Sequence, residues 1–167
     1  MNGTSALADP GTLRQRTVTA FVIGPLVIAA ILLLPTPGFA LFIGLLLLAG
    51  AWEWAALGGL EGAPARAAFV ALVLAGLIAL WLVEPARFWL IGAAACWWAL
   101  KTVQVARVKD IDPSLGWQAQ VLAEGMLILS APWAALVELH GGSAQGPLLV
   151  LFLMMLVWTA DSLAFFV

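Results

Sequence analysis

The chain has 167 residues, of which 64% are hydrophobic and only 10% are charged, with a formal net charge of −2. Soluble domains carry about 25% charged residues, because a surface in water needs polar side chains. The composition therefore excludes a soluble enzyme, and the absence of a basic tract argues against a nucleic-acid-binding domain. We expect an all-α integral membrane protein, a polytopic bundle of about six transmembrane helices with a cytoplasmic N-terminus.

Six apolar stretches approach the length of about 20 residues that a helix needs to cross a bilayer. They are separated by Pro, Gly or charged residues, where helices end. The predicted spans are Thr17–Leu34, Phe39–Leu57, Ala67–Val83, Arg87–Val105, Trp117–Leu139 and Pro147–Val167. The third and fourth are short, so one of the two is a candidate for a re-entrant or strongly tilted segment. The expected organisation is a cytoplasmic segment 1–16, a four-span bundle 17–105, a cytoplasmic loop 106–116 and two further spans in 117–167.

The distribution of positive charges predicts the orientation of these spans. With the N-terminus inside, six of the seven Lys and Arg residues fall in cytoplasmic segments, and only Arg87 falls in an outer loop. Short cytoplasmic loops of membrane proteins are enriched in positive charge. Trp81, Trp89 and Trp133 fall near the predicted outer interface, and most other tryptophans fall near the inner one, which is typical of an aromatic belt.

Three acidic residues interrupt the predicted spans, where a charge costs a few kcal/mol unless it has a partner. Glu53 and Asp161 each lie 14 residues beyond the outer start of their span, which places them about 9 Å below the inner membrane face. Glu124 lies 7 residues after Trp117 in a span of opposite direction, about 10 Å below the same face. The arithmetic thus predicts three acids at one depth, on the cytoplasmic side.

Carboxylates in such a setting suit Mg²⁺ or another hard cation, with phosphate oxygens completing its shell. A proton pathway is an alternative, as is separate pairing of each acid within the bundle. The single histidine, His140, and the single cysteine, Cys96, exclude a His/Cys zinc site and an internal disulfide.

Two segments resemble a known family. The first is Leu13-Arg-Gln-Arg16-Thr-Val-Thr-Ala, followed by an apolar span and then by Gly50-Ala-Trp-Glu53-Trp-Ala-Ala-Leu-Gly-Gly59. The second is Val157-Trp-Thr-Ala-Asp161-Ser-Leu-Ala-Phe-Phe166. Together they are similar to bacterial phosphatidate cytidylyltransferases (CDP-diacylglycerol synthases), and the resemblance extends from about Leu13 onward.

The resemblance implies transfer of CMP from CTP to phosphatidic acid, giving CDP-diacylglycerol and pyrophosphate, with Mg²⁺ as the cofactor. It implies a multi-pass protein of the inner membrane and is compatible with a homodimer. Asp161 falls at an acidic position of the family and is the candidate catalytic residue and metal ligand. Glu124 is a second candidate metal ligand, and Glu53 and Arg16 are candidate substrate-binding residues.

The family continues beyond the point that matches Val167, with a C-terminal signature that holds most of its metal and nucleotide ligands. We therefore expect this chain to represent the N-terminal portion of such an enzyme and to be inactive alone. Two other functions stay open on the sequence: a subunit of a cation- or proton-coupled transporter, and a non-catalytic membrane scaffold.

Overall fold

The computed structural model describes residues 23–107 and 118–166, and within these ranges all regular structure is helical. After a short helix, Ile23–Leu33, the chain forms α2 (Thr36–Leu57), α3 (Ala63–Leu82), α4 (Glu84–Arg107), α5 (Gln118–Gly141) and α6 (Gly146–Phe166). These five are long and apolar enough to cross a membrane. The prediction of a polytopic helical membrane protein is confirmed.

Helix ends follow the Pro and Gly breaks of the sequence. Pro37 and Pro64 lie in the first turns of α2 and α3, where proline costs no hydrogen bond because those N–H groups have no partner inside the helix. The turn between these helices contains Gly59 and Gly62 with φ of 78° and 83°, a conformation that glycine adopts without steric cost.

The predicted spans agree with α2 to α6 within a few residues at each end. The fourth helix differs most, since α4 has 24 residues and is not short. The part of the first predicted span before Ile23 lies outside the described residues.

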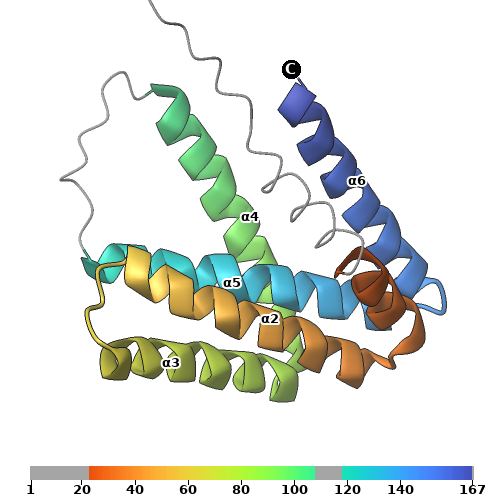
Figure 1. Cartoon of the computed structure of the whole chain (residues 1–167), viewed down its shortest axis with the longest axis horizontal. Coiled ribbons are helices and arrows are strands. Elements are labelled where there is room, and N and C mark those ends of the chain that lie inside the picture. Colours follow the sequence, from red (N-terminus) through yellow and green to blue (C-terminus); the bar gives the residue numbers. More distant parts are fainter. Residues whose placement is uncertain (1–22, 108–117, 167) are drawn as a thin grey trace, which may run out of the picture.

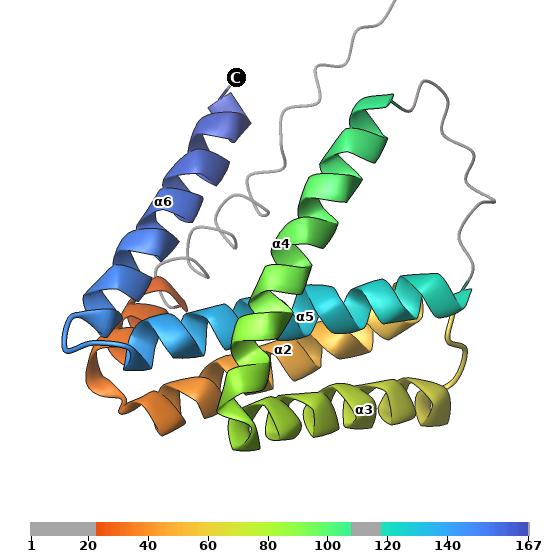
Figure 2. The same cartoon turned by 180° about the vertical axis from the view of Figure 1, so that it is seen from behind.

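Helices α2, α3 and α5 lie side by side and form one layer, as Figure 1 shows. Helix α4 crosses α5, and α6 also packs on α5. Both leave the layer toward the same side and stand apart from each other, which Figure 2 shows from behind. Most of α4 and α6 is therefore exposed within the described residues, on surfaces that a membrane would cover.

The core lies between α2, α3 and α5. Its buried residues are Ala40, Ala51, Ala55, Phe69, Val73, Leu77, Leu129, Trp133, Ala134 and Val137. The α2 members are all alanine, and small residues let membrane helices approach closely. Trp133 is only 4% exposed, and its Nε1 donates to the Ala40 carbonyl at 2.9 Å. Its predicted place in an interfacial belt is therefore wrong: this tryptophan joins α5 to α2 inside the core.

A tryptophan on α2 makes a second close contact with α5. Trp54 Nε1 donates to the Val121 carbonyl at 2.9 Å, and the ring covers Gly125, where a Cβ would lie 2.1 Å from Trp54 Nε1. The contact therefore requires glycine at position 125, because no side chain fits beneath the ring.

Candidate functional site

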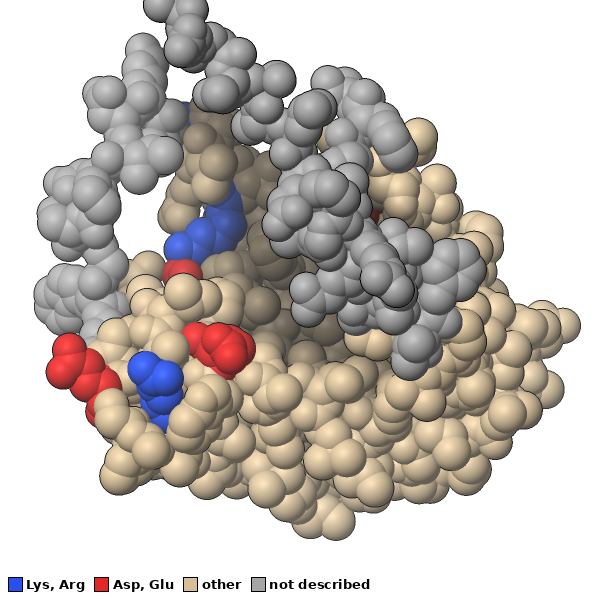
Figure 3. All heavy atoms as spheres, viewed as in Figure 1, with Lys and Arg blue, Asp and Glu red and all other residues tan. Residues whose placement is uncertain are grey.

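Charged side chains mark one end of the layer. On the face drawn in Figure 3, most of the blue and red residues gather where α2 ends and where α3 and α5 begin, and the rest of the described surface there is largely uncharged. This is the end that the charge distribution predicts to be cytoplasmic. The candidate residues Glu53 and Glu124 belong to this end by their positions near the end of α2 and the start of α5.

Glu124 holds an ion pair between two helices. Its Oε1 lies 2.5 Å from Lys101 Nζ of α4 and accepts a 3.0 Å hydrogen bond from Gln120 Nε2, one turn earlier on α5. Lys101 Nζ also lies 5.4 Å from the centre of the Trp97 ring, within reach of a cation–π interaction. A lysine, not a second acid, is thus the nearest charged group to Glu124. The spacing of Lys101 and Glu124 in the sequence does not predict this pair.

Glu53 is exposed near the end of α2 and forms no hydrogen bond or ion pair with another described residue. Its neighbour Trp52 lies beneath the guanidinium of Arg66, with Cζ 6.0 Å from the ring centre. Arg66 Nε donates to the Leu60 carbonyl at 3.1 Å. The arginine therefore closes the α2–α3 turn while Glu53 faces outward.

Asp161 lies on α6 and is exposed, with no ion pair to another described residue. The hydroxyls of Thr159 and Ser162 beside it donate to backbone carbonyls four residues earlier on α6. In both ribbon views the end of α6 lies well away from the start of α5, which carries Glu124. Arg16 lies outside the described residues.

The predicted convergence of three acids is therefore not observed. No group of three His, Cys, Asp or Glu side chains within the described ranges is placed to hold a metal ion. The predicted depths concern only one coordinate, and the departure of α6 from the layer separates Asp161 from the other two acids. Because Glu124 is already bonded to Lys101, the described carboxylates do not by themselves form a Mg²⁺ site.

A second ion pair joins α4 and α5 at the opposite end. Arg87, in the first turn of α4, is buried and pairs with Glu138 of α5. Glu84 lies 3.7 Å away on the same helix, and Trp81 is within cation–π distance at 5.9 Å. The assignment of Arg87 to an outer loop is thus wrong. The spacing of Glu84 and Arg87 was a visible signal, whereas the Glu138 contact depends on how the helices cross.

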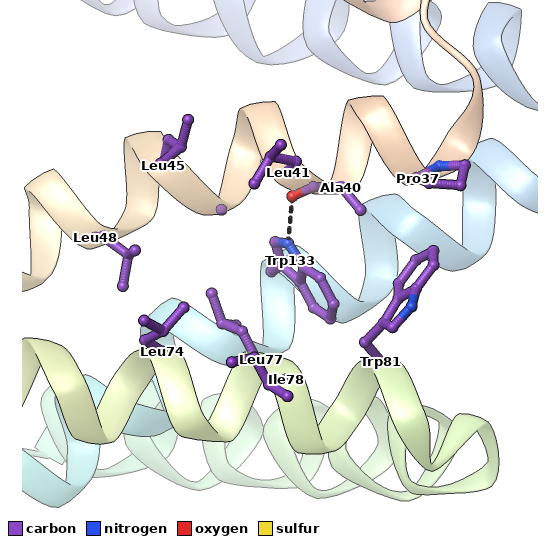
Figure 4. Close-up of a pocket in the computed structure, with 11 residues that line it drawn as sticks. Pro37, Ala40, Leu41, Leu45, Leu48, Leu74, Leu77, Ile78, Trp81 and Trp133 are labelled. Atoms are coloured by element: carbon purple, nitrogen blue, oxygen red, sulfur yellow. Dashed lines mark hydrogen bonds between the residues drawn. The ribbon is translucent and has the colours of Figure 1, made fainter.

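An apolar pocket of about 320 Å³ lies between α2 and α3. In Figure 4, Leu48 of α2 and Leu74 and Leu77 of α3 point into the space between these helices. Trp133 forms part of the wall, with its Nε1 hydrogen-bonded to the Ala40 carbonyl. Because that polar atom already has a partner, the lining is suited to hydrocarbon and not to a phosphate or a cation.

Comparison with known proteins shows the family of the chain. A family model described as "Cytidylyltransferase family" matches residues 14–167, which is nearly the whole chain. The chain belongs to the cytidylyltransferase family. The resemblance drawn from the segments around Arg16, Glu53 and Asp161 is thereby confirmed.

One curated relative is the phosphatidate cytidylyltransferase of Pseudomonas aeruginosa, which is 38% identical over 157 residues. The alignment covers 92% of this cytidylyltransferase-family chain and 56% of the relative. The chain thus spans about half the length of the curated relative. No solved structure matches the chain.

Proposed function

We propose that this chain takes part in the transfer of CMP from CTP to phosphatidic acid, which gives CDP-diacylglycerol and pyrophosphate. The observation that carries the proposal is the match to the cytidylyltransferase family over residues 14–167. The name of the relative, phosphatidate cytidylyltransferase, indicates the two substrates, CTP and phosphatidic acid. Family membership favours this activity over a transport subunit or a scaffold.

The arrangement of the helices supports a reaction at one membrane surface. CTP is soluble in water, whereas the phosphate of phosphatidic acid lies at the head-group level. The described bundle is apolar along its length and gathers charged groups at the end where α2 finishes and α5 starts. Transfer of a phosphoryl-type group depends mainly on positioning and on neutralising charge, and a charged end beside a membrane provides both.

Residue roles within this proposal follow from the resemblance. We assign Asp161 to a metal ion or a substrate phosphate, and Glu53 and Arg16 to substrate binding. Glu124 has to give up its bond with Lys101 before it can bind a cation. Mg²⁺ remains the expected cofactor, with Asp161 as one candidate ligand, and the described residues do not complete its site by themselves. Inner-membrane location and a homodimer are further parts of the proposal.

A chimera tests the activity. The chain replaces the matching part of the Pseudomonas aeruginosa relative, and CDP-diacylglycerol formation is measured in detergent with CTP, phosphatidic acid and Mg²⁺. We expect an active chimera and no activity from the 167-residue chain alone. A folded but inactive chimera would contradict the proposal.

The same chimera tests Asp161. Asp161→Asn keeps the size of the side chain and removes its charge, so activity should fall at least about 100-fold if the carboxylate neutralises a metal or positions a phosphate. Full activity of this variant, with an unchanged elution profile on gel filtration, would remove Asp161 from the site.

A further inference from the structure

Two ion pairs join α4 to α5, one near each end, and they differ in how firmly the cation is held. At the predicted outer end, the Arg87 side chain is only 8% exposed and faces two carboxylates, Glu138 and Glu84. The guanidinium has one positive charge, whereas two carboxylates and the face of the Trp81 ring lie around it. The local negative charge therefore exceeds the positive charge of Arg87. That arrangement repels a further anion and is suited to holding the helices together.

The cation of the Lys101–Glu124 pair is held less firmly. The Lys101 side chain is 28% exposed and faces one carboxylate, that of Glu124. An ammonium group has three donors, and no other side-chain or backbone acceptor within the described ranges bonds to it. Lysine also has a flexible stem of four carbons, so Nζ is able to move without displacement of α4.

Glu124 has a second hydrogen-bond donor besides Lys101. Gln120 Nε2 donates to the same Oε1 that faces Lys101, so the carboxylate remains hydrogen-bonded when the ammonium moves away. Lys101 lies six residues before Arg107, the last residue of α4, or about 9 Å along the helix. The ammonium is thus within a short distance of the predicted cytoplasmic interface.

We propose that Lys101 is a phosphate-binding residue, and that it exchanges its bond with Glu124 for a phosphate oxygen of a ligand at the predicted cytoplasmic end of α4. The proposal rests on the proposed function for the identity of the ligand, since phosphatidic acid and CTP both present phosphate oxygens. A lysine ammonium is a common phosphate-binding group in proteins. In the resting chain, Glu124 competes with the ligand for this ammonium.

Binding measurements on two variants with opposite expected effects test the exchange. The purified 167-residue chain in detergent is titrated with dioleoyl phosphatidic acid, and bound lipid is counted by native mass spectrometry. Lys101→Met should weaken binding about tenfold, because a charge-assisted hydrogen bond is lost. Glu124→Gln should strengthen binding about threefold, because the competing carboxylate is gone.

The second ion pair provides the matched control. Arg87→Met and Glu138→Gln break a pair between the same two helices and should leave phosphatidic acid affinity within about twofold. If the Lys101–Glu124 pair only holds α4 and α5 together, Lys101→Met and Glu124→Gln should change the affinity for phosphatidic acid in the same direction. Equal directions, or no effect of either variant, would therefore overturn the proposal, and Glu124→Gln alone is decisive if Lys101→Met does not fold.

Three further probes identify the source of the phosphate. A Lys101-dependent affinity for phosphatidic acid but not for CTP or inorganic phosphate assigns the lipid head group, and the reverse assigns the nucleotide. Phosphatidylcholine, which has no phosphate monoester, should bind no differently to the variants. Absence of saturable binding of phosphatidic acid, CTP and inorganic phosphate to the unmodified chain would also overturn the proposal.

Activity separates this proposal from the proposed function. An inactive chimera together with Lys101-dependent binding would contradict the enzyme assignment and support the exchange. An active chimera in which Lys101→Met leaves the KM for both substrates unchanged would overturn the exchange alone.

Discussion

His140 provides a hydrogen bond that the backbone lacks. Pro35 has no N–H, so the Ile31 carbonyl four residues earlier has no helical donor. His140 Nε2 lies 3.0 Å from that carbonyl, and its Nδ1 lies 3.1 Å from the Thr36 hydroxyl. The ring stacks on Phe39 with centroids 4.3 Å apart. Nε2 donates to the carbonyl, which only accepts, and Nδ1 bonds to the hydroxyl, which is able to donate or to accept. The histidine, at the end of α5, therefore contacts both the end of the first described helix and the start of α2.

Removal of this ring should destabilise the chain. His140→Ala leaves the Ile31 carbonyl without a donor and opens a cavity beside Phe39, and we expect a loss of about 3 kcal/mol. The free energy of unfolding is measured by denaturant titration in detergent. Thr36→Val is the milder control, because it removes only the hydroxyl and should cost about 1 kcal/mol. An equal cost for both variants would show that the carbonyl contact has no special importance.

At the scale of elements, the sequence predicted the helices better than their contacts. Each helix boundary followed a local break, such as Pro37 or the Gly59 turn, and local chemistry is visible in a sequence. The contact between Trp54 and Gly125 joins residues far apart in the chain. Its signal was a glycine inside a predicted span, which the sequence alone does not match with a partner. The same reason explains why Lys101 was not paired with Glu124.

Gly125→Ala tests the α2–α5 contact. The added Cβ overlaps the Trp54 ring and forces it away from the Val121 carbonyl, so we expect a loss of about 3 kcal/mol in unfolding free energy. Gly92→Ala in α4 is the matched control, because its Cβ meets nothing within 4 Å. The control should be neutral or stabilising by up to about 1 kcal/mol. If both variants have the same stability, the tryptophan does not need the glycine.

At the scale of the whole molecule, the predicted orientation places the α2–α3 turn on the cytoplasmic side of the membrane and the turn before α6 on the outer side. The α2–α3 turn contains exposed Glu61, and the turn before α6 contains exposed Ser143. Arg87 was the single positive charge predicted outside, and its burial beside Glu138 neutralises it. Within the described residues, the one positive charge assigned to the outer side is therefore paired with a carboxylate.

Cysteine labelling in intact cells tests this orientation. In a Cys96→Ala background, Ser143→Cys should react with a membrane-impermeant maleimide, while Glu61→Cys should react only after the membrane is opened. The reverse pattern would place the N-terminus outside. It would also move Lys101 and Glu124 away from the compartment that contains CTP.

The sequence by itself determined the membrane class, the helices and the family, because hydropathy, Pro and Gly breaks and short motifs are local properties of the chain. It also predicted a depth for each of Glu53, Glu124 and Asp161, from the fixed rise per residue of a helix. Only the tertiary structure decided which of these residues meet. The splay of α4 and α6 from the α2–α3–α5 layer separates Asp161 from Glu124, and the crossing of α4 over α5 brings Lys101 to it. Lateral position depends on how side chains pack between helices, and no local pattern encodes it.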